Sequence, residues 1–269
     1  MPAFEASTPA TGELPYPLHA IPSRVLCAPP KGQEPIVPLE GGDIHLWHLR
    51  LPIRDMNLCR VVESATTANE RARAGRLPFE DDRLRQLYTR GTLRIILGHY
   101  IGRAPNSLVF HTNPWNKPLL AEDPTLHFNV SHCRSVALIA VTRAAPVGVD
   151  LAVQRPLEER DSLFTRSLCS EERRWLSGHE TPARQDAEYF RLAAGKEAAL
   201  KALGMGLARH LDSFGVTPPA EPVGKGQIYG LKGSWTLHFP PMPPGYAASV
   251  AVTTAQTAGT LRVLTIGDA

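Results

Sequence analysis

The sequence predicts an α+β protein built from two similar subdomains, each with a helix packed on a small, mainly antiparallel sheet. Two observations lead to this fold class. A helical pattern over residues 79–101 and a helix-rich stretch over residues 157–203 are each followed by several short strand-like runs. The runs at 128–141 and 235–252 also resemble each other, since each consists of a strand, a turn and an apolar strand. A duplicated unit of this kind predicts a ligand-binding cleft between its two halves.

Proline helps to set the boundaries of the predicted subdomains. Ten of the 25 prolines fall in residues 1–52, so the first part of the chain cannot be helical. We predict a Pro-rich N-terminal arm over residues 1–40, an N-terminal α+β subdomain over 41–146 and a C-terminal α+β subdomain over 147–269. The two halves would form a pseudo-dimer within one chain, so a monomer would suffice to build the cleft.

The predicted N-terminal subdomain begins with a strand and a long helix. Residues 43–51 alternate apolar and polar side chains, which predicts a strand with one buried face. Residues 79–101 carry an apolar stripe at helical spacing. Arg83, Arg90 and Arg94 share another face of that helix, which indicates a solvated basic surface unless a partner covers it. Strand-like runs follow at residues 107–111, 126–130 and 136–141.

The predicted C-terminal subdomain repeats this order. An apolar run at 146–151 contains Asp150 and is followed by the polar, helix-rich stretch 157–203. Further strand-like runs lie at residues 214–217, 235–239 and 247–253. Each half therefore offers one long helix and several short strands.

Composition excludes several classes of protein. With 269 residues, of which 43% are apolar and 20% charged, the chain has enough apolar material for a core. The net charge of +3 is too small for a DNA coat protein, but it suits a surface that meets anionic ligands. No apolar run approaches the roughly 18 residues of a membrane span, and the first residues lack an apolar signal region, so we expect a cytoplasmic protein. The four cysteines contain no C-x-x-C pair, which argues against a metal–thiolate site.

Lysine is scarce, and two lysines flank an acid in one predicted helix. The chain has 23 arginines and only 6 lysines, and two of these lie in Gly195-Lys-Glu-Ala-Ala-Leu-Lys201. Glu197 and Lys201 share a helix face with small residues, which leaves room for a ligand beside an acid and a base. The alternative is an ordinary surface Glu–Lys pair. Lys196 falls in the middle of the apolar face.

Two further segments carry polar groups next to apolar strands. Asp150 follows Val147-Gly-Val149, and its side chain points away from the face that these valines cover. Asp150 either caps the next segment or joins Glu197 in holding a hard cation, because magnesium typically takes one or two carboxylates plus ligand phosphates. Phe128-Asn-Val-Ser-His132 precedes a turn, where His132 and nearby backbone amides can meet a phosphate.

In this order and spacing, the motifs resemble the Sfp-type 4′-phosphopantetheinyl transferases. The matching segments are Phe128-Asn-Val-Ser-His132, Val147-Gly-Val-Asp150 and Lys196-Glu-Ala-x-x-Lys201, with Gly204 and Gly206 behind them. Asn116-Lys-Pro118 is similar to a Gly-Lys-Pro element of the family, and the basic segment 73–94 extends the likeness upstream. The resemblance implies a pseudo-dimer of two α+β halves with coenzyme A in the cleft between them.

The resemblance also implies a reaction. The phosphopantetheine arm of coenzyme A would move to a serine of an acyl or peptidyl carrier protein, with magnesium as the cofactor, releasing adenosine 3′,5′-bisphosphate. The implied catalytic residues are Asp150, Glu197 and Lys201, and the implied magnesium ligands are Asp150 and Glu197. The residues implied to bind coenzyme A are Arg73, Lys117, Ser131, His132, Asp150, Glu197 and Lys201. Carrier proteins of this class are acidic, so the basic face of the first long helix gains a candidate partner.

The sequence departs from the family pattern at three positions. Ala152 stands where the family often has a third metal carboxylate, and Ala193 stands where it usually has a tryptophan. Asn116 replaces the expected glycine before Lys117. The alternative function is therefore a degenerate relative that binds coenzyme A or a carrier protein without turnover. A metal-dependent nuclease fits less well, because the usual Glu-x-Lys order is absent. Nothing in the sequence selects among fatty-acid, polyketide and peptide-synthesis carriers.

Overall fold

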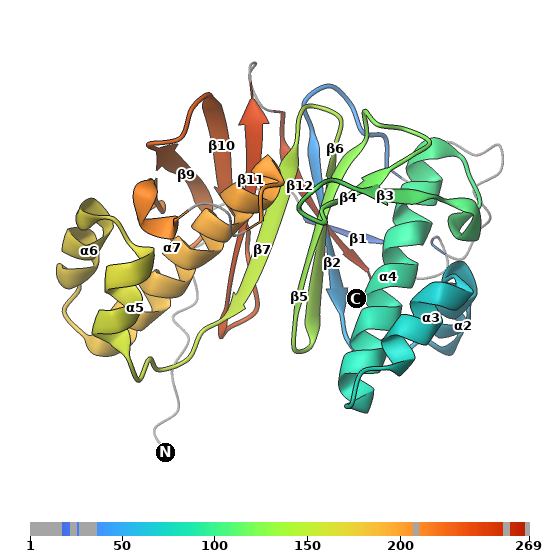
Figure 1. Cartoon of the computed structure of the whole chain (residues 1–269), viewed down its shortest axis with the longest axis horizontal. Coiled ribbons are helices and arrows are strands. Elements are labelled where there is room, and N and C mark those ends of the chain that lie inside the picture. Colours follow the sequence, from blue (N-terminus) through green and yellow to red (C-terminus); the bar gives the residue numbers. More distant parts are fainter. Residues whose placement is uncertain (1–17, 22–25, 27–36, 207–209, 255–258, 267–269) are drawn as a thin grey trace.

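The chain forms four layers, with helices on the two outer faces and two five-stranded sheets packed against each other in the middle (Figure 1). The computed structural model describes residues 18–21, 26, 37–206, 210–254 and 259–266. The predicted α+β fold of two similar halves is confirmed, since each half places a long helix on the outer face of its sheet.

The N-terminal half contains the sheet β1-β12-β2-β6-β5. Its strands are β1 (Leu18–Ile21), β2 (Ile44–Arg50), β5 (His127–Cys133), β6 (Val136–Thr142) and β12 (Leu261–Ile266). Strands β2, β6 and β5 pair antiparallel, whereas β12 pairs parallel with both β1 and β2. The outer face carries α2 (Met56–Ala65), α3 (Ala68–Gly75) and α4 (Glu80–Ile101). After α4 come η1 (Pro105–Ser107) and a hairpin of β3 (Phe110–Thr112) and β4 (Pro118–Leu120).

The C-terminal half contains the sheet β7-β11-β10-β9-β8, in which every neighbouring pair is antiparallel. Its strands are β7 (Val147–Val153), β8 (Gly215–Thr217), β9 (Gly224–Tyr229), β10 (Ser234–Phe239) and β11 (Tyr246–Thr254). The outer helices are α5 (Arg160–Ser167), α6 (Ser170–Ser177) and α7 (Pro182–Leu203), and η2 (Leu211–Ser213) precedes β8.

The two long helices, α4 and α7, end in the same way. Each has 22 residues, and each stops at a glycine in the left-handed conformation, Gly102 with φ 64° and Gly204 with φ 66°. Helix α7 begins at Pro182, directly after Thr181, whose side chain accepts the backbone N–H of Arg184. None of the described helices is long and apolar enough to cross a membrane.

Strand β2 is buried on both faces, so the prediction of one buried face was wrong. Ile44 and Leu46 pack between the two sheets, whereas Trp47 packs toward the outer helices. The apparently polar position His45 is fully buried as well, with its Nδ1 2.6 Å from the hydroxyl of Tyr100. The alternating pattern misled because the second sheet covers the face that would otherwise meet water.

The strand pairing bears on the predicted subdomain boundaries. Strands β6 and β7 follow each other in the chain but lie in different sheets, which is where the boundary between 41–146 and 147–269 was placed. Residues 261–266, however, return to the first sheet as β12, so the last strand does not belong with the C-terminal sheet. Within the predicted arm over residues 1–40, β1 pairs with β12, and most of the remainder lies outside the described residues.

Candidate active site

Strand β7 lies at the edge of its sheet and carries Asp150. Val147 and Val149 pack into the core between the sheets, so Gly148 and Asp150 face the other way, toward helix α7. Gly148 lets the strand and the helix touch, because a Cβ atom on it would lie 2.0 Å from the carbonyl oxygen of Ala198. The orientation predicted for Asp150 is therefore correct, although the residue lies in the middle of the strand rather than at its end.

Asp150, Ser131 and Lys201 form one hydrogen-bonded cluster. The Lys201 ammonium lies 2.6 Å from Asp150 Oδ1, and it also donates to Ser131 Oγ at 3.2 Å and to the carbonyl oxygen of Val149 at 3.1 Å. Ser131 donates to the same Asp150 oxygen at 3.2 Å. Ser131 comes from β5, Asp150 from β7 and Lys201 from α7, so the cluster spans the junction of the two halves.

Glu197 lies one helical turn before Lys201 and interacts with the same cluster. Its side chain is half-buried, and burial together with the negative charge of Asp150 raises the pKa of Glu197, while the positive charge of Lys201 lowers it. A cation held between the two carboxylates would relieve this repulsion. Among the described residues, no group of three or more His, Cys, Asp or Glu side chains could hold a metal. Two carboxylates are the protein ligand set that a magnesium ion typically takes when phosphate oxygens and water supply the rest, so Asp150 and Glu197 would be the residues to hold one.

His132 lies near this cluster, one residue after Ser131 on β5 and on the opposite side of the strand. Desolvation of the ring and the positive charges of Arg85 and Lys201 lower the pKa of His132. Arg85, from the first half of α4, donates through Nε to the carbonyl oxygen of Arg134 at 2.8 Å. His132 and Arg85 together offer hydrogen-bond donors and a positive charge to an anion.

Arg85 and Asn113 were not singled out from the sequence, and Asn129 was named only as part of the Phe128–His132 motif, without its partner. The only local signal for Arg85 was its i, i+3 spacing from Asp82, with which it forms an ion pair. Asn129 accepts the backbone N–H of Val149 at 2.9 Å, and its alternation with Ser131 along β5 could have indicated this. Asn113 donates to the carbonyl oxygen of Gly204 at 2.7 Å, 91 residues away, and no sequence pattern points to that contact.

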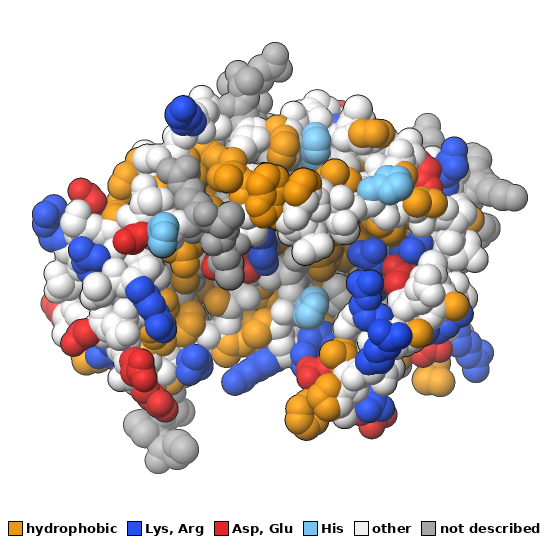
Figure 2. All heavy atoms as spheres, viewed as in Figure 1, with side chains coloured by type: hydrophobic (Ala, Val, Ile, Leu, Met, Phe, Trp, Pro, Cys, Tyr) orange, Lys and Arg blue, Asp and Glu red, His pale blue; other side chains and the backbone are white. Residues whose placement is uncertain are grey.

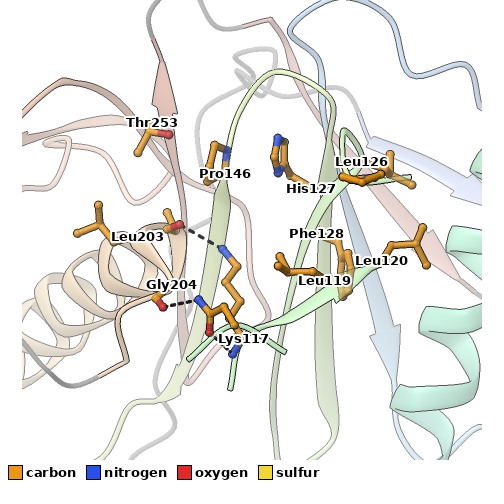
Figure 3. Close-up of a pocket in the computed structure, with 13 residues that line it drawn as sticks. Lys117, Leu119, Leu120, Leu126, His127, Phe128, Pro146, Leu203, Gly204 and Thr253 are labelled. Atoms are coloured by element: carbon orange, nitrogen blue, oxygen red, sulfur yellow. Dashed lines mark hydrogen bonds between the residues drawn. The ribbon is translucent and has the colours of Figure 1, made fainter. Parts of the chain in front are cut away.

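Lys117 uses its ammonium group inside the fold (Figure 3). Its Nζ donates to the carbonyl oxygens of Val147 at 2.9 Å, Lys201 at 2.7 Å and Ala202 at 3.2 Å. Burial lowers the pKa of Lys117 to about 8. Lys117 also lines a mainly apolar pocket of about 470 Å³ between the β3–β4 hairpin, the start of β5 and the end of α7. Binding of coenzyme A by Lys117 stays a prediction.

Two of the three arginines in the basic face predicted on α4 bind partners within the N-terminal half. Arg90 and Arg94 each donate through Nε to one carboxylate oxygen of Glu70, at 2.6 Å and 2.7 Å. Both guanidinium groups also lie over the ring of Phe110, at 4.3 Å and 5.0 Å from its centre. The prediction of a solvated basic surface was therefore wrong for Arg94, whose side chain is only 5% exposed. Arg83 is exposed.

Arg73 is not joined to the cluster. It lies exposed in the last turn of α3, and none of the hydrogen bonds or ion pairs between described residues links its side chain to Asp150, Glu197 or Lys201. Its predicted role in binding coenzyme A stays a prediction.

Lys196, the neighbour of Glu197, has a structural role. Its side chain is 1% exposed, and the ammonium lies 2.6 Å from the equally buried carboxylate of Glu172. It also donates to the carbonyl oxygens of Leu211 and Phe214, each at 2.7 Å. Glu172 in turn accepts the backbone N–H of Val216 at 2.7 Å. This network fixes α7 to α6 and to the segment that leads into β8.

Fold and site together define an α+β protein of two halves. Asp150, Glu197 and Lys201 form an acid–lysine cluster where these halves meet. In the space-filling view, acidic and basic atoms lie side by side near the centre of the face between the halves, and basic side chains gather over α4 (Figure 2). Groups of these types can bind a diphosphate. Carboxylates are ligands for a hard cation, and the lysine, histidine and arginine provide positive charge and hydrogen-bond donors.

Comparison with known proteins agrees with this class. A sequence model of the 4′-phosphopantetheinyl transferase superfamily matches residues 146–253, and one of the N-terminal part of 4′-phosphopantetheinyl transferases matches residues 56–144. The chain is 33% identical to the 4′-phosphopantetheinyl transferase HetI of Nostoc sp. over 191 residues, 70% of this chain and 80% of that protein. It is 26% identical to the 4′-phosphopantetheinyl transferase Sfp of Bacillus subtilis over 155 residues, 57% of this chain and 66% of that protein. The chain belongs to the 4′-phosphopantetheinyl transferase family of enzymes.

Proposed function

We propose that this enzyme transfers the 4′-phosphopantetheine group of coenzyme A to the serine hydroxyl of an apo acyl or peptidyl carrier protein and releases adenosine 3′,5′-bisphosphate. The observation that supports this most is the convergence of Asp150, Glu197 and Lys201 where the two halves meet. In the reaction, a bond forms between the serine oxygen and the phosphorus next to pantetheine. The bond from that phosphorus to the bridging oxygen of the diphosphate breaks.

Asp150 and Glu197 would hold a magnesium ion, which when bound supplies positive charge to the diphosphate oxygens. Lys201 adds a second positive charge beside Asp150, where negative charge moves to the leaving bisphosphate. Glu197 accepts the proton of the serine hydroxyl as a general base. Ser131, His132 and Arg85 orient the phosphates of coenzyme A by hydrogen bonds and charge.

A second candidate function, binding without turnover, is favoured by one observation. Ala152 lies on β7 two residues after Asp150 and so faces the same side of the strand, toward α7. A third carboxylate at this position would reach the cation, and alanine leaves only two. Two carboxylates with water completing the shell would hold magnesium more weakly, which slows transfer and, in the limit, leaves binding without turnover.

The experiment incubates the enzyme with coenzyme A, magnesium and a panel of apo carrier proteins from fatty-acid, polyketide and peptide synthesis. If the enzyme transfers the group, a carrier protein should gain the mass of one phosphopantetheine. The gain should be absent when a chelator is added or when the acceptor serine is replaced by alanine. Measurable coenzyme A binding with no mass gain on any carrier would favour the binding function. The proposed setting is the cytoplasm, and the proposed active unit is a monomer with an acidic carrier as its partner.

A further inference from the structure

The free edge of β7 is covered by side chains of the site. In an edge strand, alternate residues leave their backbone N–H and C=O groups without a strand partner, and these groups need other partners when they are buried. The N–H of Val149 donates to Asn129 at 2.9 Å, and the carbonyl of Val149 accepts from Lys201 at 3.1 Å. The carbonyl of Val147 accepts from Lys117 at 2.9 Å.

Lys117 joins this strand edge to helix α7. The same ammonium that binds the carbonyl of Val147 also binds the carbonyls of Lys201 and Ala202, at 2.7 Å and 3.2 Å. Carbonyls in the last turn of a helix lack the regular i+4 partner and favour a positive charge, although the carbonyl of Lys201 also accepts the Gly204 N–H at 3.2 Å. One side chain from the N-terminal half therefore ties the strand that carries Asp150 to the end of the helix that carries Lys201.

The loop before Lys117 is built to present it. Asn113 Oδ1 accepts the backbone N–H groups of Trp115 and Lys117, both at 2.9 Å, and Asn113 Nδ2 donates to the carbonyl of Gly204 at 2.7 Å. Asn116 adopts a left-handed conformation with φ 64°, which turns the chain between them. A Cβ atom on Gly204 would lie 2.9 Å from Asn113 Nδ2 and 3.1 Å from Lys117 Cδ, so glycine allows the close contact.

We propose that Lys117 is a positioning residue: it sets the spacing between the start of β7, three residues before Asp150, and the last turn of α7 at Lys201, and it does not bind the 3′-phosphate of coenzyme A. An ammonium group has three N–H bonds, and all three find carbonyl acceptors in the protein. A phosphate could bind only by displacing one of these carbonyls. This inference rests on the proposed function, since it assigns Lys117 a role in that site.

The test compares Lys117→Met with the wild-type enzyme and with Lys232→Met, in which an exposed lysine of the β9–β10 turn is changed in the same way. Calorimetry measures the affinity for coenzyme A and for dephospho-coenzyme A, which lacks the 3′-phosphate. Hydrogen exchange is followed over residues 147–150 and 198–204. Steady-state transfer is measured well below the melting temperature. Asn113→Ala, which removes the contact to Gly204 but keeps the ammonium, is the second variant.

If Lys117 is a positioning residue, Lys117→Met should keep the wild-type ratio of affinities for coenzyme A and dephospho-coenzyme A within twofold. Hydrogen exchange over residues 147–150 and 198–204 should speed up at least tenfold. Transfer should fall about 10- to 100-fold in kcat, because displacement of catalytic groups by about 1 Å has effects of this size. Asn113→Ala should change exchange and kcat in the same direction by a smaller factor, and Lys232→Met should change neither.

Loss of the preference for coenzyme A in Lys117→Met would overturn the proposal, because it would make the ammonium a phosphate ligand. Unchanged exchange over residues 147–150 and 198–204 would overturn it as well. Neither readout depends on turnover. If the enzyme modifies no carrier protein, the proposed function is wrong. The coenzyme A affinities and the hydrogen-exchange rates still decide the role of Lys117.

Discussion

Helices α4 and α7 are alike in length, in their left-handed glycine ends and in covering one sheet each, yet only α7 contributes to the acid–lysine cluster. On α4, Arg90 and Arg94 are held by Glu70. On α7, Lys196 is held in the same way by Glu172, but the ion pairs between described residues do not include its neighbour Glu197. On α7, the charges of Glu197 and Lys201 therefore lie together where the two halves meet, whereas Arg90 and Arg94 of α4 are held within one half.

The largest effect that tests this contrast is on stability. Lys196→Met leaves the buried carboxylate of Glu172 without its cation, so the free energy of unfolding should fall by about 3–5 kcal/mol. Lys201→Met, five residues on, removes a side chain that is 31% exposed and should cost less than about 1 kcal/mol. Urea unfolding measures both. Equal losses in the two variants would contradict the division of α7 into a structural lysine and a site lysine.

The next effect is on catalysis. Glu197→Gln should lower transfer by about 10²–10³-fold, because it removes both a cation ligand and the proton acceptor. Its melting temperature should be equal to or higher than that of the wild type, since burial and Asp150 already disfavour the charge on Glu197. Glu171→Gln, an exposed change at the start of α6, is the matched control. Transfer within twofold of the wild type in Glu197→Gln would remove this residue from the mechanism.

A third effect belongs to α4 and depends on pH. Burial of Glu70 opposes its charge, but hydrogen bonds from Arg94, Thr67 and Arg90 outweigh this and lower the pKa of Glu70 to about 2. Because the pKa of Glu70 is lower in the folded protein than in the unfolded chain, its charged carboxylate stabilises the fold. This stabilisation is complete above about pH 4.5 and is lost as the pH falls toward 2. Allowing for solvent screening, the contribution is about 2 kcal/mol.

In Glu70→Gln, the free energy of unfolding should therefore depend less on pH between 2 and 4.5 than it does in the wild type. Urea unfolding at a series of pH values in this range checks it. Parallel pH profiles for the two proteins would show that the carboxylate does not hold the two arginines.

The smallest effect concerns the remaining exposed arginine of α4. Arg83 donates to the backbone carbonyls of Leu77 and Pro78, and Arg90 and Arg94 on the same face are both paired with Glu70. Arg83→Ala should change stability by less than about 0.5 kcal/mol and should raise the KM for an acidic carrier less than twofold. A tenfold rise in the KM for the carrier protein in Arg83→Ala, absent at high salt, would instead show that the carrier binds to α4.

The sequence predicted the fold class and most of the acid–lysine cluster, because both follow from local patterns. Alternation placed Asp150 on the side away from the valines, and helical spacing placed Glu197 and Lys201 on one face; the structure shows both. The return of residues 261–266 to the first sheet could not be predicted in this way, since parallel pairing with β2 joins segments more than 200 residues apart.

The partners of several charged residues could not be predicted from the sequence, and the physical cause is the same for each. The partner of Arg94 lies 24 residues earlier at Glu70, the partner of Lys196 lies 24 residues earlier at Glu172, and the carbonyls that bind Lys117 lie 30 to 85 residues later. Helical and strand periodicity describe which face a side chain is on, but they do not describe what the fold brings to that face.

A crystal structure of the enzyme with coenzyme A and manganese, in which anomalous scattering locates the cation, tests the central claim most directly. We predict one manganese ion with an oxygen of Asp150, an oxygen of Glu197 and the diphosphate of coenzyme A all within about 2.3 Å of it. A cation held by the diphosphate alone, or a diphosphate bound away from both carboxylates, would contradict the account.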